Sequence, residues 1–323
     1  MAKLQSTEIV GVANRPATIC LDTLCFWFDT TNRIPMVSYC IYNNQTSSWS
    51  AGGALITARI SLAGAGTQNS ALSFGGRNPF TSNATEEYNG SSWTVGGSLS
   101  VDRYGLAGLG SQNASLAAGG LFSLTVTCTE EYDGSTWASG GVLNKDKYFF
   151  AGAGSLNVGL VMGGSDAYGT FDTYSEEYDG TTWSFVNPII TTRFRLAGAG
   201  TKNDGLAIGG LNSSNVDVSC TEEYNGLTWS AGGALITARS DLAGSGTQNE
   251  GLVTGGGVTC TEAYNGLTWS AGGNLITSRW SLASAGVQKS SLAFGGSPTA
   301  YSNTTSACTE EYCGSLEIID AYL

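Results

Sequence analysis

Paired glutamates are the residues of this chain whose type and spacing could do chemistry. A Glu-Glu pair precedes a tyrosine in five copies, and a sixth copy reads Glu262-Ala263. General acid–base catalysis needs one distinctive pair of carboxylates in one pocket. Near-equivalent copies spread over 323 residues indicate a repeated structural role instead.

Alternation along a β-strand assigns the two glutamates of each pair to different faces. The first glutamate shares a face with the tyrosine, and the second points the other way. We expect the first to be structural and to accept hydrogen bonds from an arginine of the repeat, such as Arg59 or Arg103. These first glutamates are Glu86, Glu130, Glu176, Glu222, Glu262 and Glu310.

Other catalytic chemistries are excluded by the composition. The chain contains no histidine, which excludes Ser-His-Asp catalysis, histidine-ligated metals and a copper site of the galactose-oxidase type. No Lys-Ser or Lys-Thr follows the Gly-Gly doublets, which argues against a phosphate-binding loop. We predict no enzyme activity, no catalytic residues, no cofactor and no metal.

The charge balance limits the classes of partner. Lys plus Arg total 14 and Asp plus Glu total 26, so the net charge is −12. Such a chain has no electrostatic footprint for nucleic acid or for an anionic membrane. The N-terminal residues lack the apolar stretch of a signal peptide, and no run of apolar residues could span a membrane. We expect no nucleic-acid partner and no membrane insertion.

Half of the eight cysteines follow the repeat. Cys128, Cys220, Cys260 and Cys308 each lie four residues before a repeat tyrosine. Equivalent positions in different repeats should be farther apart than the Cα–Cα limit of about 7 Å for a disulfide. We expect buried free thiols, as in a reducing cytoplasm. A local disulfide among Cys20, Cys25 and Cys40 stays open.

Three signatures recur in a fixed order and indicate the elements that position these residues. The first is an arginine followed by a small-residue segment that ends at Gly-Gly, and in the third unit we align Tyr148 with the arginine. The second is Thr-Glu-Glu-Tyr, and the third is a tryptophan five residues after that tyrosine. The tryptophans are Trp49, Trp93, Trp137, Trp183, Trp229 and Trp269. Their spacing matches the period of a four-stranded propeller blade, about 40–50 residues.

Each unit divides into four short strands. Segments such as 62–66, almost all Ala and Gly, suit the innermost strand, where space near a propeller axis is smallest. Asn-Gly or Asp-Gly before five of the six tryptophans, all except Trp49, favours a tight hairpin. Trp49 precedes the first complete unit, whereas the last Thr-Glu-Glu-Tyr has no tryptophan after it. We therefore expect residues 39–49 to supply the last strand of a sixth blade, the alternative being a seventh blade from residues 17–49.

The order Arg, Gly-Gly, Tyr, Trp over residues 39–316 resembles the kelch repeat. More narrowly, TEEYNGSSWTVGG and ARxxLAGAGTQN look like repeats in proteins of tailed bacteriophages, particularly phages of aquatic bacteria and cyanobacteria. The segment from Trp27 to Trp49 is similar to an element common in phage fibre and tail proteins. The resemblance implies a kelch-like β-propeller in a virion, often a fibre or receptor-contacting protein, with no enzyme activity.

Binding is expected in the loops after each Gly-Gly, because they differ most between units and variable loops on a rigid scaffold commonly carry binding. The segment 165–174 is the longest and the best single candidate, with ordinary loop packing as the alternative. The aromatic residues of these loops are Phe80, Phe122, Tyr168, Phe171, Tyr174 and Tyr301.

Residues 1–38 form a separate N-terminal arm in this interpretation, residues 39–316 the propeller and residues 317–323 a tail. The arm contains Phe26, Trp27 and Phe28 and is too apolar for a free tail. It either packs on its own propeller or docks into a neighbouring subunit.

The sequence thus predicts an all-β, kelch-like propeller that serves as a non-enzymatic virion protein, assembled in the host cytoplasm. Its expected partners are other virion proteins in a symmetric assembly and a glycan or protein of the host surface. The alternative function is a soluble, lectin-like propeller that binds carbohydrate.

Overall fold

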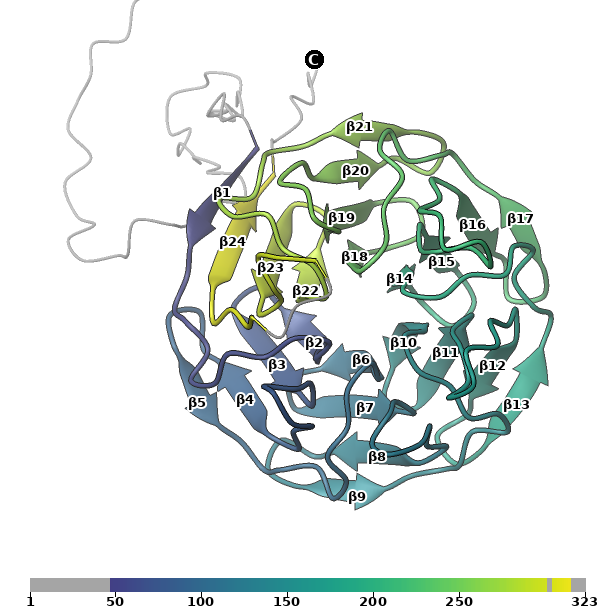
Figure 1. Ribbon diagram of the computed structural model, residues 1–323, viewed down its shortest axis with the longest axis horizontal. Coiled ribbons are helices and arrows are strands. Elements are labelled where there is room, and N and C mark those ends of the chain that lie inside the picture. Colours follow the sequence, from purple (N-terminus) through teal and green to yellow (C-terminus); the bar gives the residue numbers. More distant parts are fainter. Residues whose placement is uncertain (1–46, 301–303, 315–323) are drawn as a thin grey trace, which may run out of the picture. The chain divides into compact units, whose positions relative to one another are not determined.

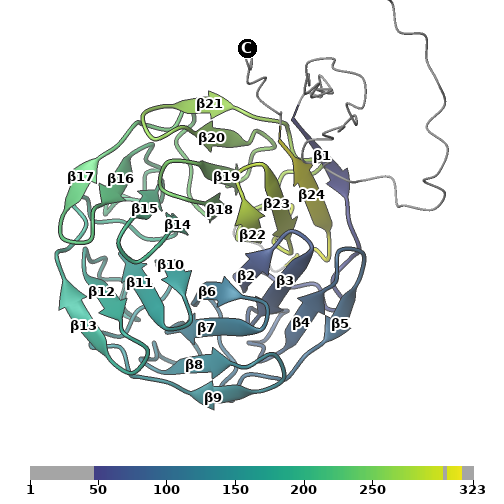
Figure 2. The same cartoon turned by 180° about the vertical axis from the view of Figure 1, so that it is seen from behind.

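The structure of the chain, a computed structural model, describes residues 47–300 and 304–314. Its 24 strands form six antiparallel sheets of four strands, arranged around one axis (Figure 1). No helix occurs within these two ranges. The prediction of an all-β propeller with six blades is confirmed, and the view from behind shows the same arrangement (Figure 2).

The blades are numbered in chain order, each from the axis outward. Blade 1 has β2 (Ala63–Thr67), β3 (Ser70–Phe74), β4 (Thr85–Tyr88) and β5 (Trp93–Val95). Blade 2 has β6 (Ala107–Ser111), β7 (Ala114–Ala118), β8 (Thr129–Tyr132) and β9 (Trp137–Ser139). Blade 3 has β10 (Ala151–Ser155), β11 (Val158–Met162), β12 (Ser175–Tyr178) and β13 (Trp183–Val186).

The remaining blades follow the same plan. Blade 4 has β14 (Ala197–Gly200), β15 (Gly205–Ile208), β16 (Thr221–Tyr224) and β17 (Trp229–Ala231). Blade 5 has β18 (Leu242–Gly246), β19 (Gly251–Gly255), β20 (Glu262–Tyr264) and β21 (Trp269–Ala271). Blade 6 has β22 (Ala283–Val287), β23 (Ser290–Phe294), β24 (Thr309–Cys313) and β1 (Ser48–Ala51).

Blade 6 closes the ring by combining the two ends of the propeller sequence. β1 pairs antiparallel with β24, and Trp49 lies opposite Tyr312 as the other tryptophans lie opposite their tyrosines. The predicted closure by an N-terminal strand is therefore confirmed. The expected arm with Phe26, Trp27 and Phe28, and the tail after 316, lie outside the described residues.

The innermost strands consist of small residues because neighbouring blades approach each other closely there. A Cβ on Gly64 of β2 would lie 2.7 Å from the ring of Phe294 and 2.8 Å from the carbonyl oxygen of Ser284 in blade 6. The buried apolar side chains form clusters between adjacent blades, such as Leu72 and Phe74 with Leu106. Burial of these side chains holds the blades together.

Hydrogen bonds of the repeat tyrosine and tryptophan join each blade to the preceding one. The Tyr132 hydroxyl donates to Oε1 of Glu87 at 2.5 Å, and Nε1 of Trp137 donates to Oγ1 of Thr85 at 2.9 Å. Equivalent Tyr-to-Glu bonds join Tyr178 to Glu131, Tyr224 to Glu177, Tyr264 to Glu223 and Tyr88 to Glu311. The second glutamate of each pair thus accepts a hydrogen bond that links its blade to the next one.

Two substitutions interrupt this pattern. Ala263 stands in blade 5 where the other blades have the second glutamate, so the Tyr312 hydroxyl of blade 6 has no glutamate opposite it. Ser175 stands in blade 3 in place of the repeat threonine, and its buried hydroxyl has no hydrogen-bond partner. Nε1 of Trp229 donates instead to the carbonyl oxygen of Asn187, at 3.1 Å.

Candidate functional site

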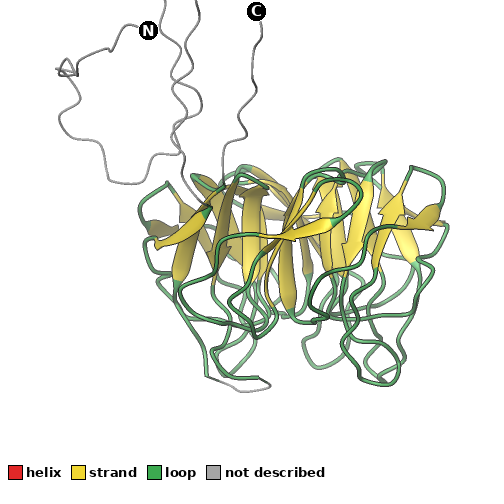
Figure 3. Ribbon diagram, turned by 90° about the horizontal axis from the view of Figure 1, so that it is seen from above, coloured by secondary structure: helices red, strands yellow, loops and turns green. Residues whose placement is uncertain are grey.

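Loops of very different length emerge from the two faces of the propeller (Figure 3). The first and third turns of each blade are short hairpins on one face. The second turn, after Gly-Gly, and the connection to the next blade emerge on the other, which we call the long-loop face. The loop aromatics singled out from the sequence that the structure describes belong to turns of this face.

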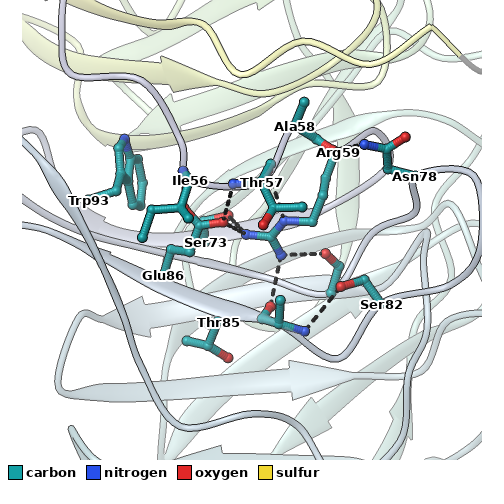
Figure 4. Close-up of polar contacts among 12 residues, drawn as sticks. Ile56, Thr57, Ala58, Arg59, Ser73, Asn78, Ser82, Thr85, Glu86 and Trp93 are labelled. Atoms are coloured by element: carbon teal, nitrogen blue, oxygen red, sulfur yellow. Dashed lines mark hydrogen bonds and ion pairs between the residues drawn. The ribbon is translucent and has the colours of Figure 1, made fainter.

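A buried ion pair anchors the loops of five of the six blades, as Arg59 shows in blade 1 (Figure 4). The Arg59 guanidinium is fully buried and donates to Oε1 of Glu86 at 2.9 Å, and also to the carbonyl oxygen of Gly75 at 2.6 Å. The other carboxylate oxygen of Glu86 accepts the backbone N–H of Ile56 at 2.7 Å. One pair therefore fixes both the turn after Gly-Gly and the connection between blades.

The pair recurs in four further blades, as the sequence predicted. The partners are Arg103–Glu130, Arg193–Glu222, Arg239–Glu262 and Arg279–Glu310. Burial lowers the pKa of Arg59, while the nearby Glu86 charge raises it. Because all these carboxylates are held by buried arginines and backbone N–H groups, the repeat pairs are scaffold.

Blade 3 departs from the pattern and corrects the alignment of the third unit. Lys147, not Tyr148, takes the place of the arginine: its side chain is fully buried and Nζ donates to the carbonyl oxygen of Tyr174 at 3.1 Å. Burial lowers the pKa of Lys147, which nearby Asp172 opposes. Glu176 is held by Asn144 instead, through its backbone N–H at 2.8 Å and its side-chain amide at 2.9 Å. The misalignment arose because a lysine replaced the repeat arginine.

The four repeat cysteines are free thiols, as predicted, but the prediction that they are buried is wrong. Cys128, Cys220 and Cys260 are half-buried and Cys308 is exposed. They lie at the loop end just before the third strand, where the backbone carbonyl of each accepts a hydrogen bond from the buried arginine. The Cys128 thiol also contacts its arginine, with Nη1 of Arg103 2.9 Å from Sγ. Cys313, at the end of β24, is disulfide-bonded.

The loop aromatics fall into two groups. Phe80 and Tyr168 are more than four-fifths exposed and Phe122 is half exposed, so these three present apolar surface to solvent. Phe171 instead stacks on Phe194, with ring centroids 4.1 Å apart. Their role in binding stays a prediction.

Tyr174 lies beside two side chains of its own blade. The Lys145 ammonium is 4.9 Å from the centre of its ring, and Phe185 is 5.5 Å away. Tyr301 lies outside the described residues. Among the loop residues that the structure describes, the exposed aromatics belong to blades 1, 2 and 3, so these loops are not equivalent from blade to blade.

The inner mouth of the propeller on the long-loop face holds a feature that the sequence analysis missed. Six residues, each two positions after the buried Arg or Lys, have φ between +50° and +64°. Each donates its backbone N–H to the carbonyl oxygen of the same position in the preceding blade, at 2.7–3.0 Å, which closes a ring of six hydrogen bonds. We call these residues the mouth ring: Ser61, Gly105, Phe149, Arg195, Asp241 and Ser281.

The mouth ring repeats in backbone but not in side chain. The left-handed conformation costs a non-glycine residue about 1–2 kcal/mol, and only Gly105 avoids that cost. The sequence did carry a sign of this feature, since two blades have a charged residue, Arg195 or Asp241, at this position of an otherwise apolar segment. The ring keeps five side chains where glycine would be easier to accommodate.

Three of these side chains form a polar cluster. Nη1 of Arg195 donates to Oδ2 of Asp241 at 2.6 Å, and Oγ of Ser281 donates to Oδ1 of Asp241 at 2.8 Å. The Arg195 guanidinium also lies over the rings of Phe149 and Phe194, at 4.6 and 5.3 Å from their centres. The mouth ring and the three residues that follow it in each blade line a cavity of about 140 Å³ on the axis.

The solved structure entitled "Structure of YjhT" is similar to this chain, with a TM-score of 0.68. The similarity covers 80% of this chain and 96% of that one, at 12% sequence identity. The two chains share a fold. At this identity the likeness extends to the propeller and no further. No protein-family model matches the chain, and no curated protein sequence matches it.

The described residues offer neither a metal-binding cluster nor a membrane-spanning helix. Within residues 47–300 and 304–314, no group of three or more His, Cys, Asp or Glu side chains is arranged to hold a metal ion. The same part of the chain contains no helix long and apolar enough to cross a membrane.

Proposed function

We propose that this chain is a non-enzymatic binding protein that attaches to its partner through the long-loop face. The observation that carries the proposal is the contrast within each blade between a repeated anchor and a variable loop. In five blades an Arg–Glu pair holds the turn after Gly-Gly in the same way, and in blade 3 the buried Lys147 takes the place of the arginine. The turns themselves differ, and those of blades 1, 2 and 3 present Phe80, Phe122 and Tyr168 to solvent. Variable loops on a rigid scaffold are where binding commonly lies.

The absence of enzyme activity is part of the proposal. In blades 1 and 2, the first glutamate is bound to a buried arginine and the second accepts a tyrosine hydroxyl of the next blade. Glutamates occupied in this way are not available as an acid–base pair.

The setting we propose is the virion of a tailed bacteriophage, as a tail or fibre component. Support comes from the resemblance of the TEEYNGSSW and ARxxLAGAGTQN segments to phage repeats. The proposed partners are other virion proteins in a symmetric assembly, and a glycan or protein of the host surface. The proposed place of assembly is the host cytoplasm.

Quantitative mass spectrometry of purified particles from the source tests the virion proposal. We expect the chain at a fixed multiple of a known tail or capsid component. If it is made during growth but missing from the particles, the virion proposal fails. Attachment of the purified chain to host cells tests the long-loop face separately. We expect Phe80→Ser and Tyr168→Ser to weaken attachment. Glu250→Gln, on the opposite face, should leave attachment unchanged.

A soluble, lectin-like protein is the second candidate. It is favoured by exposed aromatic side chains and a polar cavity on one face, a combination that suits carbohydrate. Absence from particles together with glycan binding would support it over the virion component.

A further inference from the structure

We infer that the cavity inside the mouth ring binds one neutral sugar unit, the end of a glycan that the long-loop face contacts. This inference rests on the proposed binding role of that face. It names the ligand class and a site distinct from the exposed loop aromatics.

Five positions of the mouth ring have a side chain although the backbone conformation there favours glycine. Glycine is abundant in this repeat, and Gly105 shows that it fits the ring. Arg195, Asp241 and Ser281 nevertheless hold positive φ at equivalent positions. Strained residues that a structure retains cluster at binding and active sites, so these side chains are kept for what they contact.

Electrostatics selects the charge of the ligand. The Asp241 side chain is 4% exposed and the Arg195 side chain 20% exposed, at 2.6 Å from each other. Their charges neutralise each other, so an anion would meet the Asp241 carboxylate and a cation the Arg195 guanidinium. A neutral ligand avoids both repulsions.

Hydrogen bonding and rigidity select its class. A guanidinium only donates hydrogen bonds and an ionised carboxylate only accepts them, whereas a hydroxyl does both. Adjacent hydroxyls of a sugar ring can therefore contact Arg195, Asp241 and Ser281 together. The rings of Phe149 and Phe194 hold the guanidinium in place, which reduces the entropy lost on binding.

The size of the cavity limits the ligand to one unit. Its volume is about 140 Å³, below the range of about 300–1,000 Å³ for drug-sized ligands. The cavity opens on the face that carries the long loops, so the rest of a glycan would extend over those loops.

Calorimetric titration of the full chain with methyl glucoside, methyl galactoside and methyl mannoside tests the inference, with methyl glucuronide as the anionic comparison. We expect at least one neutral glycoside to bind, and to bind more tightly than the glucuronide. Asp241→Gly, and Arg195→Gly combined with Asp241→Gly, should weaken binding at least about tenfold. Glycine suits positive φ, so both variants should keep the fold, which thermal melting verifies.

Glu250→Gln is the matched control, because Glu250 is exposed in a hairpin of the opposite face. It should leave the affinity unchanged. The inference is overturned if no neutral glycoside binds, if the glucuronide binds more tightly, or if the mouth variants keep wild-type affinity. Loss of host attachment in Tyr168→Ser but not in Asp241→Gly would reject this site while leaving the proposed function standing.

Discussion

Two positions of the repeat, two residues apart, have opposite fates. The first is Arg59 and its equivalents, where five blades keep arginine and one has Lys147. The second is the mouth ring, where the six blades have five different residue types. The backbone repeats at both positions, yet only the buried one repeats its side chain.

The difference separates scaffold from site. At the first position five blades have the same arginine bonds to the glutamate and carbonyl groups, and Lys147 keeps the carbonyl bond in blade 3, so burial and these bonds fix the type of side chain. At the second position the hydrogen bonds are made by the backbone alone, and any side chain that tolerates positive φ can be presented. In a propeller built from repeats, function is to be sought where the backbone repeats and the side chains do not.

Removal of a buried arginine should give the largest effect. Arg59→Met leaves the Glu86 carboxylate buried without its partner, which should lower the free energy of unfolding by about 3–5 kcal/mol. Urea unfolding measures this loss. Arg59→Met combined with Glu86→Gln should recover part of it, because the uncompensated charge is gone.

The matched change at the mouth ring should cost far less. Arg195→Gly combined with Asp241→Gly removes both partners of a largely buried pair together, so that no uncompensated charge is left behind, and relieves two strained residues. We expect the free energy of unfolding to stay within about 1 kcal/mol of wild type. A loss as large as that of Arg59→Met would break the distinction between scaffold and site.

Alkaline pH should weaken the bonds between blades. Burial, and then the hydrogen bond to a glutamate, raises the pKa of Tyr132, Tyr178 and Tyr264 to about 12. The folded state therefore holds these protons more tightly than the unfolded chain, and the stability they contribute is lost as pH rises from about 10 through about 12. The lowered pKa of Lys147 has the opposite effect, because it makes the folded state more stable as pH rises. It is one group, whereas several tyrosines contribute to the loss.

Urea unfolding at a series of alkaline pH values measures this loss. Tyr178→Phe should flatten the pH dependence. Tyr168→Phe, on an exposed loop, serves as the control and should leave it unchanged. An equal pH dependence in wild type and Tyr178→Phe would contradict the assignment to the inter-blade tyrosines.

Completion of the scaffold pattern in blade 5 should stabilise the chain. Ala263→Glu places a carboxylate opposite the Tyr312 hydroxyl, as Glu87 lies opposite Tyr132. We expect a gain of about 1 kcal/mol, read as a higher melting temperature. Glu223→Ala, which removes the equivalent bond to Tyr264, should lower the melting temperature, and a gain there would contradict the assigned role.

The smallest expected effect concerns blade 3. Ser175→Thr restores the repeat residue, whose hydroxyl accepts a tryptophan N–H in other blades. In the variant, the buried hydroxyl at position 175 would accept a hydrogen bond from Nε1 of Trp229. We expect a gain of about 0.5 kcal/mol, measured by urea unfolding, and no gain if Trp229 is replaced by Phe.

The sequence was sufficient to predict the blades, the ring closure and the Arg–Glu pair, because all three depend on residues that recur at one period. Lys147 was missed because it departs from the recurring type, although its burial follows the same plan. The mouth ring could not be derived from periodicity. It becomes visible only when Arg195 and Asp241, separated by a whole blade in the sequence, lie 2.6 Å apart.

The mouth ring also links the closure of the propeller to the number of its blades, because each of the six blades donates one of its hydrogen bonds. The sequence from Asn225 to Gly233 recurs without change from Asn265 to Gly273. Recombination between the two copies would delete one whole blade and leave every junction intact. The shortened chain would still have the side chains for its inter-blade contacts, but its backbone would have to close a ring of five members instead of six. Near-identical repeats make a gene prone to gain or lose a blade by recombination. A protein that lost one would have to close its ring of hydrogen bonds with a different number of members, which disfavours such a change.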